Sequence, residues 1–249
     1  MHLRPVKLVK LAIVAVGIAG FVWVCAARLP RSQGKGALMA GLVPLSLVYL
    51  AAEWYDNRQR RRLIVARLAD LGFLEDEPNF HESEVHYTPE RGHRGFEVKL
   101  FAEAEWQGRR ARVAEFQFRT GGRRNSQAWK SFQAAVECPD AWPALELLPT
   151  PGSFSMMPDR AYKRGQKLGE GGFARRWRVA APDLEAADAV LTPELRSWLE
   201  GASWRERWCI RDGWLSCTRL GTADERRAEA LLARAAAFLA RAGRRAVAA

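Results

Sequence analysis

The hydrophobic pattern divides the chain into an apolar N-terminal region and a longer region in which apolar and polar positions alternate. Two runs without charged residues occupy the first region, at 11–27 and 37–52. Both are apolar all round, and with their flanking residues each approaches the roughly 20 residues that a helix needs to cross a bilayer. We predict a transmembrane helical hairpin over residues 1–55, with spans at about 8–27 and 37–55.

Basic residues flank these runs unevenly, and this asymmetry sets the predicted orientation. Eight Lys and Arg lie on the two outer flanks, and three lie in the loop between the runs. Because cytoplasmic flanks carry the excess of positive charge, we predict a multi-pass protein of the inner (plasma) membrane with both termini cytoplasmic. The alternative is a cleaved signal peptide ending near Cys25 and a single anchor, which would place the domain outside.

Beyond the second run the pattern becomes that of a charged helix, which Gly72 is expected to end. Residues 56–74 are therefore predicted to form a basic helical stalk. The stalk leads into residues 75–249, which we predict to be a cytoplasmic domain. At about 180 residues, such a domain can bury one sizeable core without metal or disulfides.

Period-two alternation begins at Phe96 and predicts a half-buried strand through Trp106. A turn at Gln107-Gly108 leads to a second strand over 109–119. The apolar residues of that strand switch from odd to even positions, which predicts a bulge near Ala114. Further strands are predicted at 128–138, 144–148 and 173–180.

The last third of the chain combines capped helices with a tight hairpin. Asp183 and Thr192-Pro193 are typical helix starts, and a closing helix is predicted over 223–242. Asp212-Gly213 is a favoured two-residue hairpin turn. Its register places four residues on one face: Trp208, Ile210, Leu215 and Cys217. Hairpin-linked strands with late helices make the predicted fold class α+β, with a mainly antiparallel sheet.

Charge and cysteine content narrow the predicted partners. The formal net charge is +11, but residues 1–62 hold ten basic and two acidic residues, so the remainder carries only +3. This modest charge argues against nucleic acid as a partner, whereas the basic N-terminal region suits anionic head groups. The four cysteines include no CxxC pair and fit free thiols in a reducing compartment.

Several short motifs follow one another in a characteristic order. They are Leu71-Gly72-Phe73, Trp106-Gln107-Gly108-Arg109-Arg110, the stretch from Leu148-Pro149 to Met157-Pro158, Phe173 opening a strand that ends in Arg178-Val179, and Leu191-Thr192-Pro193-Glu194-Leu195 with Trp198-Leu199 after it. In this order they resemble an uncharacterised bacterial, mainly actinobacterial, family of membrane-anchored proteins. The resemblance implies two membrane helices followed by a cytoplasmic α+β domain. It transfers no activity and no catalytic residue.

A glycine-rich segment, Lys167 to Ala174, resembles the loop that covers the ATP phosphates in protein kinases. The phosphate-pairing lysine is absent, because no Lys follows Lys167. Neither His-Arg-Asp nor Asp-Phe-Gly occurs, and the glycine-lysine pattern of a P-loop is missing too. We interpret the segment as a loop that leads into the strand beginning at Phe173.

Three histidines, His81, His86 and His93, lie among glutamates and are the weak metal candidates of this chain. His81 and His86 are five residues apart, whereas the helical zinc-protease motif needs four so that both rings share a face. A solvated loop is the interpretation that we favour. No catalytic residue, cofactor or cofactor-binding residue is predicted.

Two residue types cluster without defining a site. The arginines from Arg109 to Arg124 either face an acidic partner or form an outer sheet face balanced by Glu103, Glu105 and Glu115. The tryptophans between Trp177 and Trp214 either line a pocket for an apolar ligand or pack in the core. In both cases we favour the structural interpretation.

The predicted function is that of a non-catalytic, membrane-tethered interaction module. Its predicted partners are the lipid bilayer and an unidentified protein. The alternative is a membrane-associated enzyme that acts on an envelope or lipid substrate, with a metal held in the loop of His81, His86 and His93. Membrane tethering follows from the apolar runs, and the absence of a catalytic motif favours binding over catalysis.

Overall fold

The computed structural model describes residues 12–13, 15–17, 19, 31–75, 94–120, 127–150, 165–203, 206–222 and 224–242. The chain forms two compact units, Met1–Leu63 and Ile64–Ala249. The second unit contains the whole sheet and the helices that follow it. The functional discussion below concerns this second unit.

The structure corrects the predicted N-terminal architecture. Among the described residues, no helix is both long enough and apolar enough to span a bilayer. The second predicted span, 37–55, belongs to one continuous 40-residue helix, α2 (Arg31–Asp70), whose sequence also holds ten charged residues. The first, 8–27, falls almost wholly outside the described residues. The predicted transmembrane hairpin is therefore wrong, and the multi-pass inner-membrane localisation with cytoplasmic termini, which depended on it, is wrong too.

Helix α2 ends at the glycine that the sequence indicates. Gly72 has a φ of +85°, which a side chain would strain, and its N–H donates to the Ala69 carbonyl at 2.9 Å. The Phe73 N–H donates back to the Leu68 carbonyl, also at 2.9 Å. These two bonds form a Schellman cap, and the buried side chains of Leu68 and Phe73 supply its apolar contact.

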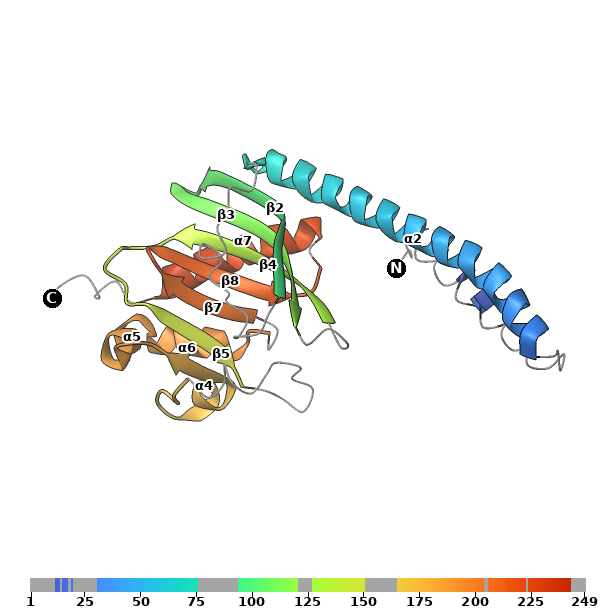
Figure 1. The fold of residues 1–249 in the computed structure, drawn as a ribbon. Coiled ribbons are helices and arrows are strands. Elements are labelled where there is room, and N and C mark those ends of the chain that lie inside the picture. The colour runs from blue at the N-terminus through green and yellow to red at the C-terminus, as the bar shows by residue number, and fades with distance from the viewer. Residues whose placement is uncertain are drawn as a thin grey trace. The chain divides into compact units, whose positions relative to one another are not determined.

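In the described part of the chain, eight strands form one fully antiparallel sheet. They are β1 (Leu74–Glu75), β2 (Arg94–Trp106), β3 (Arg109–Thr120), β4 (Gln127–Glu137), β5 (Leu145–Pro149), β6 (Trp177–Ala180), β7 (Glu206–Arg211) and β8 (Trp214–Leu220). Their order in the sheet is β1-β2-β3-β4-β8-β7-β5-β6 (Figure 1). The pairing of β4 with β8 joins an earlier and a later part of the chain at the centre of the sheet. The predicted antiparallel sheet is thus present.

Two hairpins have the turn that strand twist favours. Gln107 and Gly108 have φ of 53° and 72°, and Asp212 and Gly213 have φ of 51° and 74°. Positive φ at both central residues is the signature of a type I′ turn. The β7–β8 register is the predicted one: Arg211 pairs with Trp214, Ile210 with Leu215, and Trp208 with Cys217.

Strand β3 carries apolar residues on both faces of the sheet. Ala111 and Val113 belong to the main core, whereas Phe116 and Phe118 form a second cluster with Phe96 and Trp129 on the opposite face. The change from odd to even positions therefore needs no bulge in β3, and the predicted bulge near Ala114 is wrong. The extra residue is in the neighbouring strand: Val98 pairs with Phe116 and Leu100 with Glu115, which leaves Lys99 unpaired in β2.

Four helices accompany the later strands: α4 (Gly171–Arg176), α5 (Leu184–Val190), α6 (Pro193–Glu200) and α7 (Glu225–Arg241). The predicted caps are confirmed. Asp183 accepts hydrogen bonds from the N–H groups of Glu185 and Ala186, and Thr192 accepts one from Leu195. The strand predicted over 173–180 is wrong in its first half, because residues 173–176 continue α4 and only Trp177–Ala180 is extended.

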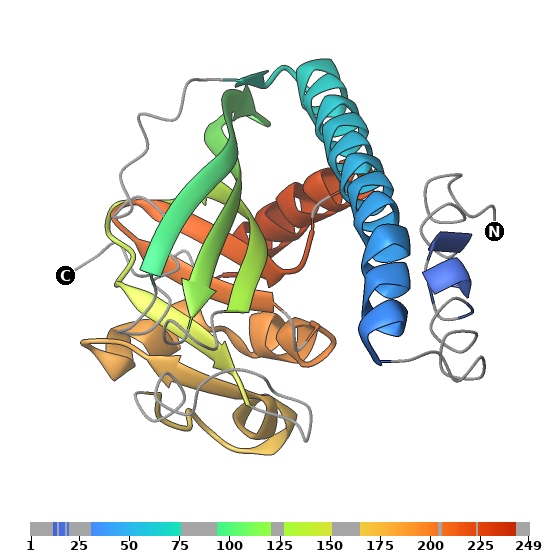
Figure 2. The same cartoon turned by 45° about the vertical axis from the view of Figure 1, so that its right-hand side comes forward.

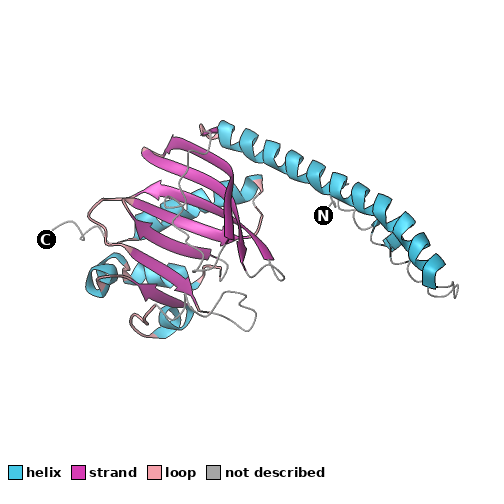
Figure 3. Ribbon diagram, in the orientation of Figure 1, coloured by secondary structure: helices cyan, strands magenta, loops and turns pink. Residues whose placement is uncertain are grey.

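Helix α7 covers the centre of one face of the sheet. It packs on β4 and β8, and its buried side chains Leu232, Ala235 and Phe238 join the main core. Figures 1 and 3 show α7 behind the strands, and Figure 2, turned by 45°, shows α4, α5 and α6 gathered beside β5 and β6. On the near side in Figure 3, no described helix lies over β3, β4 and β8. The sheet is therefore covered unequally by the described helices.

Candidate ligand pocket

The predicted metal candidates His81, His86 and His93 lie outside the described residues. Within the described part of the chain, no group of three His, Cys, Asp or Glu side chains is placed to hold a metal ion. The metal-loop alternative therefore stays a prediction.

The glycine-rich segment holds a carboxylate of the protein itself. The Phe173 N–H, in the first turn of α4, donates to Oε1 of Glu200 at 2.9 Å. A Cβ added at Gly172 would lie 2.4 Å from the other carboxylate oxygen of Glu200, so a larger residue here would require the end of the Glu200 side chain to shift. Glu200 thus occupies the place that a phosphate would take at the start of the helix. The structure assigns the segment a packing role.

The late tryptophans are mainly core residues, as we favoured. Trp177 and Trp208 are fully buried, and Trp177 Nε1 donates to the Leu199 carbonyl at 3.0 Å. The Trp208 ring stacks on Phe238, with centroids 5.0 Å apart, and meets Trp198 edge-on at 5.7 Å. These rings pack between α6, α7 and the sheet, which supports the core interpretation over a ligand pocket for them.

The early arginines are divided between the two faces of the sheet. Arg110 and Arg112 lie on the face opposite α7 and share Glu103: Arg112 Nε donates to Oε2 at 2.8 Å, and Arg110 Nη2 donates to Oε1 at 2.6 Å. Partial burial alone would raise the pKa of Glu103, but the two guanidinium groups hydrogen-bonded to it hold that pKa below its usual range. Both guanidinium groups also lie over the Trp214 ring, at 5.7 and 4.0 Å from its centroid. Glu115, expected in this cluster, is buried on the other face.

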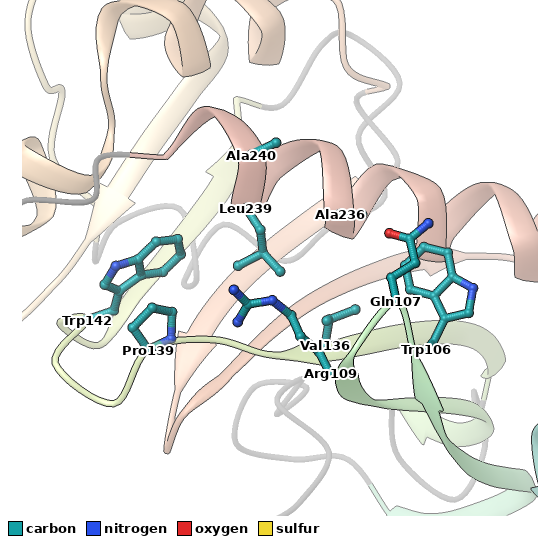
Figure 4. Close-up of a pocket in the computed structure, with 9 residues that line it drawn as sticks. All are labelled: Trp106, Gln107, Arg109, Val136, Pro139, Trp142, Ala236, Leu239 and Ala240. Atoms are coloured by element: carbon teal, nitrogen blue, oxygen red, sulfur yellow. The ribbon is translucent and has the colours of Figure 1, made fainter.

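A pocket of about 420 Å³ opens on the face that carries α7. Three segments line it: the β2–β3 turn with its flanking strand residues, the end of β4 with the connection after it, and the outer part of α7. The lining residues are Trp106, Gln107, Arg109, Val136, Pro139, Trp142, Ala236, Leu239 and Ala240. Figure 4 shows Trp142 and Pro139 at one end and Trp106 and Gln107 at the other, with Leu239 and Arg109 between them. Its volume lies within the roughly 300–1,000 Å³ of small-molecule sites.

The local fold explains why these side chains converge. The type I′ turn ends β2 at Trp106 and begins β3 at Arg109, and these two residues are cross-strand partners on the same face. Trp142 is held in the β4–β5 connection, where its N–H donates to the Pro139 carbonyl at 3.0 Å. Ala236, Leu239 and Ala240 recur at helical spacing and present one face of α7 to the pocket. Two small alanines leave the space that the tryptophans border.

The Cys138 thiol, which lies beside the pocket, is expected to be unreactive. Cys138 lies between Val136 and Pro139, two pocket residues, and is itself buried. Burial, together with the negative charge of Asp140, raises the pKa of the Cys138 thiol to about 12. A thiol with such a pKa is protonated at neutral pH and is a poor nucleophile.

The pocket lining is suited to holding a molecule and poorly suited to transforming one. Seven of the nine lining residues are apolar, and the other two are Gln107 and Arg109. Neither can act as a nucleophile, and a guanidinium does not give up its proton in proteins. Sequence reasoning missed this site, since its residues come from three separate segments with no common motif. Among the motifs noted in the sequence, the turn motif from Trp106 to Arg110 was the one that includes residues of this pocket.

The fold and the site together define an α+β domain with a small, mainly apolar pocket. Among its nine lining residues, Arg109 is the one with a positively charged side chain. No model of a known protein family matches the chain, and no curated protein matches it. Among solved structures the chain is similar to the crystal structure of the mycobacterial trehalose monomycolate transport factor A, TtfA. The two share 14% sequence identity over 72% of this chain and 92% of that one, with a TM-score of 0.47. A similarity at this level supports no inference about activity. The predicted family resemblance stays a prediction.

Proposed function

We propose that this chain is a non-catalytic binding module whose pocket holds the apolar part of a small molecule. The observation that carries the proposal is the lining itself. Trp106, Trp142 and Leu239 offer apolar surface from three sides, and none of the nine lining residues can supply a nucleophile or a general base. Binding without conversion is the activity that these side chains support.

The size of the pocket supports a ligand larger than a single ring. An apolar cavity of roughly 150 Å³ is large enough for benzene. With about 420 Å³, this pocket has room for roughly two to three ring volumes. Removing such a body from water is favourable in proportion to the apolar area buried. The lipid bilayer and an unidentified protein stay predicted partners from the sequence, and this proposal does not depend on them.

Filling the pocket from α7 tests the proposal. Ala240 is exposed and lines the pocket, so an Ala240→Trp substitution places a large ring in the space with little risk to the core. The matched control is Ala233→Trp, because Ala233 is also exposed on α7 and does not line the pocket. The probe is phenylnaphthylamine, an uncharged dye whose fluorescence rises in apolar sites.

We expect the wild-type chain and Ala233→Trp to bind the dye with the same Kd. Ala240→Trp should weaken binding at least tenfold, because its indole takes the volume that the dye needs. Equal binding by all three proteins would overturn the proposal, since the dye would then lie elsewhere. Circular dichroism of each variant checks that α7 is intact.

A further inference from the structure

We infer that the natural ligand of this pocket is an organic acid, whose carboxylate pairs with Arg109 while its apolar body lies against Trp106, Trp142 and Leu239. The inference rests on the proposed function, since it assigns the chemical class of the ligand that the pocket binds. It depends on the charge of one residue and on the apolar character of its neighbours.

Within the described part of the chain, Arg109 has no acidic partner. Its Nη1 donates to the backbone carbonyl of Glu137 at 3.3 Å, a long hydrogen bond, and among the described residues no carboxylate lies within ion-pair distance of it. Asp140 is in the connection that borders the pocket, yet it neither lines the pocket nor pairs with Arg109. In Figure 4 the guanidinium of Arg109 is turned toward Leu239. The charge is therefore available to a bound anion.

Other arginines that lie against aromatic rings show the contrast. Arg110 and Arg112 share Glu103, and Arg234 Nη2 lies 2.8 Å from Glu206. In each case the guanidinium near a tryptophan ring is matched by a carboxylate of the same chain. Arg109, the cross-strand partner of Trp106, has no such match among the described residues. A guanidinium presents parallel N–H donors that fit a carboxylate, which is the group that the other arginines of this domain bind.

The apolar residues of the lining determine what the rest of the ligand, beyond its carboxylate, must be. An inorganic anion would satisfy Arg109 but would leave Trp106, Trp142 and Leu239 facing water. A neutral apolar molecule would fill the space but would remove water from the guanidinium without replacing its hydrogen bonds, which costs free energy. A carboxylate attached to a body of roughly two to three ring volumes satisfies both demands. The ligand class is thus an amphiphilic organic acid.

A pair of dyes that differ in one charge tests this inference on the full chain. Anilinonaphthalene sulfonate carries an anionic group on the same aromatic body as the uncharged phenylnaphthylamine. The variant is Arg109→Gln, which keeps a polar side chain and removes the charge. The matched control is Arg110→Gln, which removes the neighbouring charge from the opposite face of the sheet. Ala240→Trp gives the background from dye bound outside the pocket.

We expect Arg109→Gln to weaken binding of the anionic dye about tenfold and not to weaken binding of the uncharged dye, which no longer has to remove water from a guanidinium. Arg110→Gln should change neither. Added salt should weaken the anionic dye in the wild-type chain and lose this effect in Arg109→Gln, because salt screens a partly exposed charge. Naphthylacetate should displace the bound dye, and naphthaleneethanol, which lacks the carboxylate, should do so at least tenfold less well.

The outcomes separate this inference from the function on which it rests. If Ala240→Trp leaves the uncharged dye bound, the pocket is not a binding site and both proposals fail. If Ala240→Trp removes that dye while Arg109→Gln has no selective effect on the anionic one, the binding function stands and the inference of an acid fails. Displacement by naphthaleneethanol as efficient as by naphthylacetate would overturn the inference as well.

Discussion

The two faces of strand β3 place neighbouring arginines in opposite situations. Arg110 and Arg112 share Glu103 and lie over Trp214, whereas Arg109 lines a pocket on the other face and, among the described residues, donates to a backbone carbonyl and pairs with no carboxylate. Successive side chains of a strand point to opposite faces, so adjacent residues in the sequence need not share an environment. The comparison shows that positively charged residues that are adjacent in the sequence can lie on opposite faces of a sheet and have unrelated roles. One is neutralised within the fold, and the other is free to bind.

The largest effect that we expect is on the rate at which cysteine thiols react with an alkylating reagent. One cysteine on each face of the sheet allows the two faces to be compared. Cys138 belongs to the face with α7 and Cys209 to the opposite one, and burial raises the pKa of each to about 12. Nearby carboxylates, Asp140 and Glu146, add to the rise in pKa. At pH 8 the thiolate fraction should be about a thousandfold lower than for a thiol of ordinary pKa near 8.5.

We therefore expect both cysteines to resist iodoacetamide at pH 8 in the folded chain and to react fully in urea, as measured by peptide mass spectrometry. Because the thiols stay protonated below pH 12, raising the pH from 7 to 9 should leave both unmodified. Rapid labelling of Cys209 alone would mean that the face opposite α7 is open to solvent, and the comparison would need revision.

A Trp214→Ala substitution tests how the neutralised face is held together. It removes the ring over which Arg110 and Arg112 lie, together with apolar surface of a half-buried residue. We expect the free energy of unfolding to fall by about 2–3 kcal/mol, less than for a fully buried tryptophan. Urea denaturation measures it, and Trp214→Phe, which keeps a ring, should recover more than half of the loss. A loss below about 0.5 kcal/mol would show that these cation–π contacts contribute nothing.

Glu103→Gln removes the shared carboxylate and should cost about 1 kcal/mol at pH 7, because Arg112 is only 22% exposed and loses its partner. The pKa of Glu103 is lowered in the folded state, so its stabilising effect is present above the ordinary pKa of 4.5 and disappears as the pH falls through the lowered value. The difference in unfolding free energy between wild type and variant should therefore shrink at pH 3. A difference that stays constant from pH 7 to pH 3 would contradict the shared ion pair.

Arg109→Gln should have the smallest effect on stability. Its guanidinium is exposed and has one long hydrogen bond, so we expect the unfolding free energy to change by less than about 0.5 kcal/mol. Thermal unfolding without ligand measures this change. A loss above about 1 kcal/mol would make Arg109 a structural residue, and its role in the pocket would lose its basis.

Local signals in the sequence predicted most of the domain. The turns at Gln107-Gly108 and Asp212-Gly213, the caps at Asp183 and Thr192, and the stop at Gly72 are all present. Each depends on interactions between residues close in sequence, such as an Asp side chain and the next N–H groups. The register of the β7–β8 hairpin followed from its turn, because a two-residue turn fixes which residues pair.

Features that depend on distant segments were missed or misjudged. Residues 173–176 are helical, and the Phe173 N–H in this helix is bound by Glu200, a partner 27 positions away. The pocket is lined by residues near Trp106, near Trp142 and near Leu239. A pattern within any one of these segments does not predict it. The transmembrane prediction took two apolar runs as sufficient, whereas the structure places the second of them in a helix that continues through charged residues.

Helix α7 has a consequence for synthesis on the ribosome. The strands at the middle of the sheet, β4 and β8, pair residues as distant as Ser131 and Leu220, and α7 then covers both. The apolar side chains of β4 thus emerge long before the elements that shelter them. Such a nascent chain stays exposed until translation has passed Arg241 and the exit tunnel has released it. We therefore expect the core of this domain to be completed only after α7 has emerged, which leaves β4 accessible to chaperones until then.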